Sequence, residues 1–239
     1  MGTLFLRGLL LAVALPAAAT EDTDMLGAGH WEINLGVAQE HHAASSERAL
    51  PAIDASYGLG DQLQLLIAQP FINASEGSEG GKSGLGAATA GLKWRWLDAP
   101  EQGYTLGWYP RLTWSPSGSS AARGVAPQGH SLVLPLLAGF RSGDTGWFAE
   151  LGRNLVQRGP DEWRVGVKVM KQCLPQLECR IELDHSKAAG TPGQSLLSAG
   201  GKWSLGPGLL LQASAGRDIA GVREERRRLV LYLGVQLLR

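Results

Sequence analysis

The feature that most constrains the fold is a two-residue alternation of apolar and polar side chains, which recurs in about a dozen short segments. In one of them Tyr104, Leu106 and Trp108 alternate with Thr105 and Gly107. This period is typical of a β-strand with one apolar and one polar face. Since turn-forming residues separate the segments, the sequence predicts an all-β chain.

The first residues have the composition of a secretory signal peptide. Arg7 supplies a positive charge, Gly8–Leu15 form an apolar core, and Ala17–Ala19 are the small residues that precede a cleavage site. The apolar run is too short to cross a hydrocarbon layer of about 30 Å as a helix. We therefore expect residues 1–19 to be a cleaved signal peptide and residues 20–239 to form one domain.

An exported chain with this alternation predicts a transmembrane antiparallel up-and-down β-barrel in the bacterial outer membrane, with about 12 strands. The strands are expected near 30–39, 51–59, 62–71, 84–96, 104–114, 130–140, 146–156, 161–170, 178–185, 195–204, 208–217 and 227–238. Pro135 falls inside one of them and indicates a bulge, because proline cannot donate to the ladder.

The connections between these strands differ in length from one side of the predicted barrel to the other. The expected outer loops are 41–50, 72–83, 115–129, 157–160, 186–194 and 218–226, and the inner turns are 60–61, 97–103, 141–145, 171–177 and 205–207. Long outer loops and short inner turns are typical of outer-membrane barrels. Whether 115–129 folds into the lumen is left open by the sequence.

The tryptophans distinguish the barrel from a soluble β-sandwich, which would also alternate. They fall on the apolar face at strand ends, with Trp31, Trp96, Trp147 and Trp203 at inner ends and Trp114 and Trp163 at outer ends. Indole rings favour the membrane interface, so this placement favours the barrel.

Composition excludes several classes of function. The chain has 22 basic and 22 acidic residues, and removing Arg7 with the leader leaves 21 minus 22, or −1. Without excess charge we expect no nucleic-acid partner. No glycine-rich stretch follows a strand and opens a helix, so no cofactor is expected. Cys173 and Cys179 are predicted to form a disulfide that closes a turn, as suits an exported chain.

The polar faces of the predicted strands carry many charges. The candidate pore-lining residues are Glu32, Asp54, Lys93, Arg95, Arg111, Glu150, Arg164, Lys168, Glu182 and Lys202, and Asp184 lies on the same face. In a channel such charges set selectivity. In a filled lumen they would instead pair with one another.

Several motifs resemble a family of outer-membrane proteins named for the meta-cleavage pathway of phenol degradation. They are Asp54-Ala-Ser-Tyr-Gly-Leu-Gly-Asp-Gln-Leu-Gln-Leu65 with Pro70, Gly84-Leu-Gly86, Gly91-Leu-Lys-Trp-Arg-Trp-Leu-Asp98, and the closing Leu231-Tyr-Leu-Gly-Val-Gln236. The clear match covers about 50–115. The resemblance implies a transporter that passes small, hydrophobic or aromatic compounds across the outer membrane.

We therefore predict a channel for passive passage of small solutes, in contact with outer-membrane lipid and lipopolysaccharide, and no enzyme. The alternatives are a lipid-modifying barrel enzyme and a non-conducting structural barrel. The enzyme would use Asp184-His185-Ser186, but adjacent strand residues face opposite sides, which argues against a nucleophile–base pair. The sequence leaves the oligomeric state open.

Overall fold

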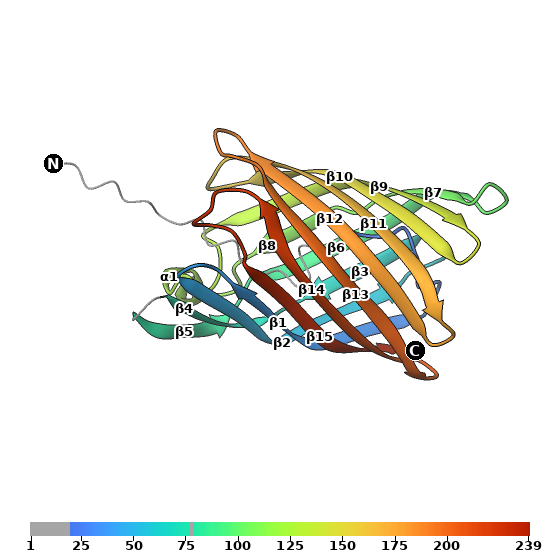
Figure 1. The fold of residues 1–239 in the computed structure, drawn as a ribbon, viewed down its shortest axis with the longest axis horizontal. Coiled ribbons are helices and arrows are strands. Elements are labelled where there is room, and N and C mark those ends of the chain that lie inside the picture. Colours follow the sequence, from blue (N-terminus) through green and yellow to red (C-terminus); the bar gives the residue numbers. More distant parts are fainter. Residues whose placement is uncertain (1–19, 77–78) are drawn as a thin grey trace.

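The structure is a computed structural model that describes residues 20–76 and 79–239. The predicted signal peptide, residues 1–19, lies outside the described residues. One antiparallel sheet closes on itself to form the barrel, because β1 pairs with both β2 and β15 (Figure 1). No helix in the described ranges is long and apolar enough to cross a membrane.

Fifteen strands make up twelve antiparallel staves, which confirms the predicted number. Three staves are each broken into two strands, β3 with β4, β5 with β6, and β7 with β8. The bounds are β1 Trp31–His41, β2 Ser45–Gly58, β3 Leu63–Ala68, β4 Phe71–Glu76, β5 Glu79–Leu85, β6 Ala88–Ala99, β7 Tyr104–Trp108, β8 Arg111–Trp114, α1 Gly118–Ala122, β9 His130–Ser142, β10 Thr145–Val156, β11 Glu162–Leu174, β12 Leu177–Ala188, β13 Gln194–Gly206, β14 Leu209–Ala220 and β15 Leu229–Leu238.

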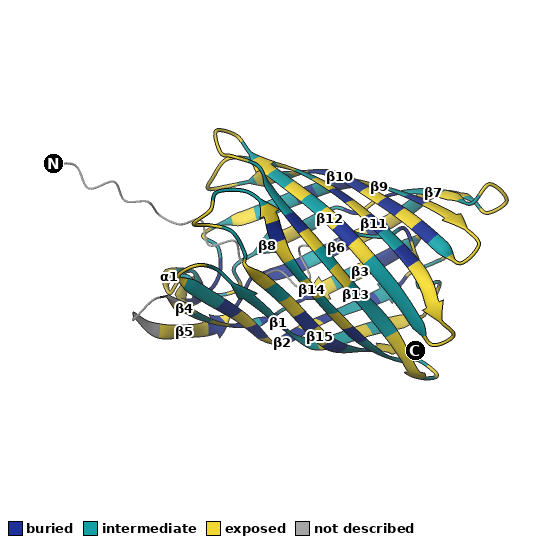
Figure 2. Cartoon of the chain, viewed as in Figure 1, coloured by how far each residue is buried: buried dark blue, intermediate teal, exposed yellow. Residues whose placement is uncertain are grey.

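The barrel has the reverse polarity of a soluble protein. Large apolar side chains such as Ile67, Trp147 and Ile181 are exposed on its outer face, while polar ones such as Gln64 and Gln236 are buried inside. Figure 2 shows the resulting alternation of exposed and buried residues along the staves. An apolar outer band around a polar interior is the arrangement that a lipid bilayer stabilises.

One end of the barrel, here called the turn end, carries short connections at 59–62, 100–103, 143–144, 175–176 and 207–208. The opposite loop end carries 42–44, 115–129, 157–161, 189–193 and 221–228, together with the β4–β5 hairpin. The C-terminus lies at the turn end (Figure 1). The predicted asymmetry is therefore present.

Two of the predicted outer loops are wrong. β2 already begins at Ser45, inside the predicted loop 41–50, and the predicted loop 72–83 is largely the β4–β5 hairpin. Both stretches have polar residues on successive positions, as in Ser45-Ser46-Glu47-Arg48. Strands that extend beyond the apolar band have no lipid-facing side, so they lose the alternation that predicts them.

The bulge predicted at Pro135 is absent from β9, and an interruption lies in the neighbouring stave instead. β9 pairs with β10 in unbroken register through Pro135 and Gly152. On the other edge, β7 ends at Trp108 and β8 begins at Arg111, and the Tyr109 N–H donates to the Pro135 carbonyl over 3.2 Å. The expected bulge in β9 is wrong, because the interruption of β7–β8 accommodates the missing N–H.

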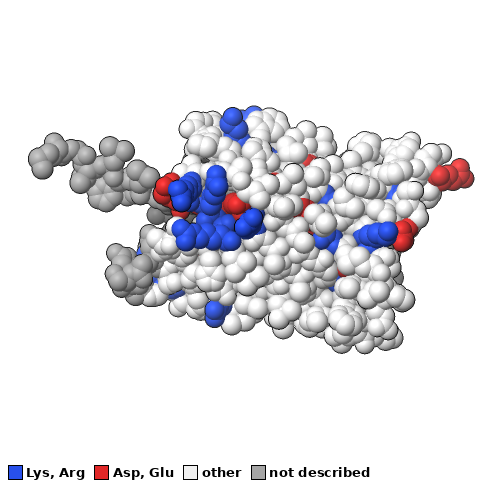
Figure 3. Space-filling view, viewed as in Figure 1, with Lys and Arg blue, Asp and Glu red and all other residues white. Residues whose placement is uncertain are grey.

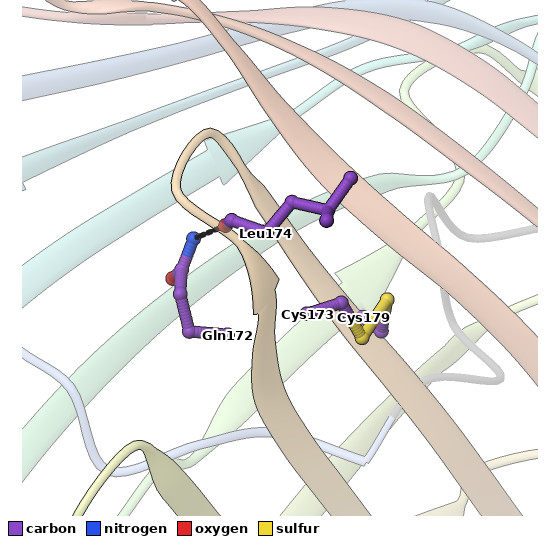
Figure 4. The surroundings of a disulfide bond; sticks show 4 residues. All are labelled: Gln172, Cys173, Leu174 and Cys179. Carbon is purple, nitrogen blue, oxygen red and sulfur yellow. Dashed lines mark hydrogen bonds between the residues drawn. A yellow bond between two sulfur atoms is a disulfide. The ribbon is translucent and has the colours of Figure 1, made fainter.

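The predicted disulfide is confirmed. Cys173 in β11 and Cys179 in β12 are bonded across the turn, with 5.9 Å between their Cα atoms. Beside it the Gln172 side-chain amide donates to the Leu174 carbonyl over 2.7 Å (Figure 4). The bridge closes a connection at the turn end.

The connection 115–129 does fold inward. It contains the short helix α1, and Val125 packs in a buried apolar cluster with Ile72, Ala49 and Tyr232 from β4, β2 and β15. This connection therefore covers part of the inner wall near the loop end.

Candidate functional site: a charged lumen held by the N-terminal segment

The lumen is occupied by residues 20–30, here called the N-terminal segment, which precede β1. The segment enters at the turn end, where the Gly29 N–H donates to the Gly58 carbonyl over 2.8 Å. A Cβ at Gly58 would lie 1.7 Å from the Gly27 carbonyl oxygen, so only glycine allows the segment to pass the wall here. The Leu26 N–H then donates to the Gln64 side chain over 3.2 Å.

Halfway along the lumen the segment meets five of the predicted pore-lining residues, here called the lumen belt. They come from five strands: Lys93 on β6, Arg111 on β8, Glu150 on β10, Lys168 on β11 and Glu182 on β12. Four of them are buried, at 2–6% exposure, and Arg111 is half-buried. Each lies between outward-facing apolar neighbours, so the alternation that exposes those neighbours to lipid points the belt inward.

Asp22 connects two separated parts of the belt. Its carboxylate lies 3.4 Å from the Lys93 Nζ and 3.1 Å from the Lys168 Nζ. β6 and β11 are separated by the staves of β7, β9 and β10. One carboxylate therefore neutralises two buried ammonium groups, whose ion pairs within the described residues are with the segment and not with the wall.

Glu21 completes the belt on the side of β8 and β10. The Arg111 guanidinium donates both to the Glu21 carboxylate and, over 3.2 Å, to Glu150. The Glu21 N–H donates to the other Glu150 oxygen over 3.1 Å. Charge-assisted hydrogen bonds of this kind are roughly twice as strong as neutral ones. The segment is therefore bound to the wall by charged hydrogen bonds as well as by packing.

Two aromatic rings lie inside the belt. The Lys93 Nζ is 5.1 Å and the Arg111 Cζ 4.8 Å from the centre of the Tyr109 ring, and the Lys168 Nζ is 5.5 Å from that of Phe148. Cations at these distances from a ring face are attracted by its quadrupole. The belt therefore offers both positive charge and aromatic surface.

The remaining pore-lining candidates lie on the inner wall but outside the belt. Glu32 and Asp54 both accept from the Asn34 amide over 2.8 Å. Arg95 contacts Asp98, at 2.9 Å, near the turn end. Arg164 and Lys202 are half-buried on β11 and β13.

Sequence reasoning missed the N-terminal segment, because Thr20–Asp24 has no strand alternation. A signal was nevertheless present in the charges. The inward faces of the predicted strands carry six cations against five carboxylates, and the acidic stretch after the leader contains Glu21, Asp22 and Asp24. Buried charges need partners, so an acidic segment beside a cationic lumen is a candidate occupant.

His185 and Ser186 point to opposite faces of β12, as the strand alternation predicts. His185 faces outward, and its Nδ1 lies 2.8 Å from the Oγ of Ser195 on β13, not from Ser186. Within residues 20–76 and 79–239 no carboxylate hydrogen-bonds this ring, and no group of three or more His, Cys, Asp or Glu side chains is placed to hold a metal ion.

No protein-family model matches the sequence. No curated protein matches it either. Solved structures resemble it in fold: an outer membrane channel from Pseudomonas putida F1 is 15% identical with a TM-score of 0.64, covering 92% of this chain and 99% of that chain. The NanC porin is 8% identical with a TM-score of 0.63, covering 87% of this chain and 98% of that one. The KdgM porin in complex with disordered oligogalacturonate is also 8% identical, with a TM-score of 0.59 and coverage of 85% and 98%. The chain therefore has the fold of outer-membrane channel barrels.

Proposed function

We propose that this protein is an outer-membrane channel for small solutes, with its turn end in the periplasm. The observation that carries the proposal is the polar, charged lumen that the N-terminal segment fills with its own carboxylates. A barrel built only for structure has no need of buried lysines that depend on a separate segment for neutralisation. The fold of the P. putida channel and of the two porins supports the same function.

The solute class follows from the charges of the lumen belt that remain when the N-terminal segment leaves the lumen. The belt then holds three cations, Lys93, Arg111 and Lys168, against two carboxylates, Glu150 and Glu182, and Glu182 already has Arg180 at 3.0 Å. The carboxylates of Glu21 and Asp22 occupy the positions that an anionic solute would take. The channel therefore favours small anions.

Aromatic carboxylates fit the belt best. The rings of Tyr109 and Phe148 lie beside the same cations, so a solute with one carboxylate and one ring can use both kinds of contact. The resemblance to the phenol-degradation family, which implies aromatic compounds, supports this choice. The KdgM porin in complex with disordered oligogalacturonate is a structural neighbour of the same fold.

Planar-bilayer recordings test the proposal. We compare the mature chain with a variant that lacks residues 20–29, under a salt gradient and with benzoate, phenol or benzylammonium added. The deletion variant is expected to conduct in steps, to prefer anions, and to be interrupted by benzoate more than by the other two. A folded barrel without current would support the structural alternative, and preference for benzylammonium would contradict the assigned solute class.

Lipopolysaccharide is the proposed partner of the outer surface. Arg217 at the outward face of β14 and Arg223 and Arg228 in the following loop are exposed. Figure 3 shows Lys and Arg side chains gathered at the loop end, over the connection between β14 and β15. Lipid phosphates would neutralise them.

A lipid-modifying enzyme is the second candidate, favoured by the contact between His185 and Ser195. Both residues lie on the lipid-facing side, where a lipid ester would approach. Lipid turnover that is lost in His185→Ala and in Ser195→Ala would establish this activity. Unchanged lipid in the presence of the wild-type barrel would reject it.

A further inference from the structure

Thr20, which is buried at 1% exposure, meets a cluster of carboxylates on β10 and β12. Its backbone nitrogen donates to the Glu182 carboxylate over 3.1 Å, and its hydroxyl donates to Asp184 over 3.1 Å. The next backbone nitrogen, of Glu21, donates to Glu150. Two successive backbone nitrogens and the Thr20 hydroxyl thus donate to three wall carboxylates.

This cluster has more hydrogen-bond acceptors than the single N–H of a peptide bond can satisfy. A peptide nitrogen carries one N–H, which Glu182 already uses. The second oxygen of Asp184 is buried and has no hydrogen-bond partner among the described residues. A buried carboxylate oxygen without a donor is costly, so the cluster is built for a group with more donors and positive charge.

The position of Thr20 supplies such a group. The sequence predicts cleavage between Ala19 and Thr20, and hydrolysis of that bond adds water: the hydroxyl goes to the Ala19 carbonyl carbon and hydrogen to the Thr20 nitrogen. Protonation in water then gives an ammonium group with three N–H donors in place of one. We propose that the mature chain begins at Thr20 and that its α-ammonium group binds the cluster of Glu182, Asp184 and Glu150, locking the segment in the lumen.

The wall at this point fits the chain closely. A Cβ at Gly166 on β11 would lie 2.2 Å from the Thr20 hydroxyl oxygen and 2.9 Å from an Asp184 oxygen. Only glycine gives the chain end room beside β11. Removal of the signal peptide and docking of the N-terminal segment are therefore linked. The positive charge that binds the cluster exists only after cleavage of the bond between Ala19 and Thr20.

The first test is chemical. Periodate cleaves the vicinal amino alcohol that only an N-terminal serine or threonine has, so a chain that begins at Thr20 is oxidised to an aldehyde. We expect the protein purified from outer membranes to begin at Thr20 by mass. We also expect it to react at least about tenfold more slowly when folded than when denatured. A different first residue, or equal rates, would overturn the proposal.

The second test separates the charge from burial. One glycine placed before Thr20 turns its nitrogen back into an amide and moves the ammonium group away. Loss of a charge-assisted hydrogen bond at this site should raise the open probability of the channel about tenfold. In the Glu182→Gln background the same extension should have a much smaller effect, because the two changes remove one interaction. Equal effects in both backgrounds would contradict the ion pair.

The inference rests on the proposed channel only in its second test. The periodate rates need no current, so a folded but silent barrel would overturn the channel and still allow the ammonium site to be judged.

Discussion

Asp22→Asn should open the channel far more often than any other single change in the N-terminal segment. Asp22 is the partner of two ammonium groups whose side chains are only 6–7% exposed. Removing one partner of a buried ion pair costs about 3–5 kcal/mol, and we take about 3 kcal/mol because Glu21 remains 3.9 Å from the Lys93 Nζ. That energy corresponds to about a 100-fold shift between the docked and released segment.

Single-channel recording measures this shift as open probability, and Asp24→Asn is the matched control. Asp24 lies two residues away and pairs with Arg141, but both side chains are about half exposed. An exposed pair contributes at most about 1 kcal/mol, so the control should change the open probability no more than about fivefold. Equal effects of the two substitutions, or no effect of Asp22→Asn in a barrel that folds normally, would refute the role given to the belt.

Three further outcomes follow from separate contacts. Gly166→Val should displace the segment and make the deletion of 20–29 redundant; a double variant more conductive than Gly166→Val alone would contradict this. Cys173→Ser should lower the free energy of unfolding by about 2 kcal/mol through loss of loop closure, seen as a lower denaturation midpoint with unchanged conductance. The neighbouring Glu40 carboxylate, 3.7 Å from the His42 Nε2, raises the pKa of His42 in the loop after β1. The charged imidazole therefore stabilises the contact with loop 221–228 below the ordinary histidine pKa, and this stabilisation is lost as the pH rises through the raised pKa. Hydrogen exchange in that loop should therefore increase at pH 8.5 over pH 6 beyond the intrinsic rate, and His42→Gln should remove the difference.

The sequence could predict the barrel wall because lipid imposes a strict period on it. Leu92 and Trp94 face outward and Lys93 faces inward. The orientation of each such triplet can be predicted from its own three residues, without the rest of the chain. Where lipid no longer acts, as in the first residues of β2 and in the β4–β5 hairpin, the period disappears and the strands were predicted as loops.

The lumen could be predicted only in part. The same alternation identified which charges face inward, but pairing among them depends on the curvature of the closed sheet, which brings Lys93 and Lys168 to one carboxylate from distant strands. The occupant itself is an irregular segment held by individual hydrogen bonds, as at Leu26 and Gln64. Such contacts have no local sequence period.

A reversible covalent lock tests most directly whether the N-terminal segment closes the channel. The hydroxyls of Thr23 in the segment and Thr105 in β7 are in contact, so cysteines at these two positions can form a disulfide across the lumen. The oxidised Thr23→Cys/Thr105→Cys barrel should carry no current, and dithiothreitol should restore the openings of the wild type, which itself should keep conducting after the same treatment. Wild-type currents through the fully oxidised, cross-linked barrel would contradict the claim that this segment controls the lumen.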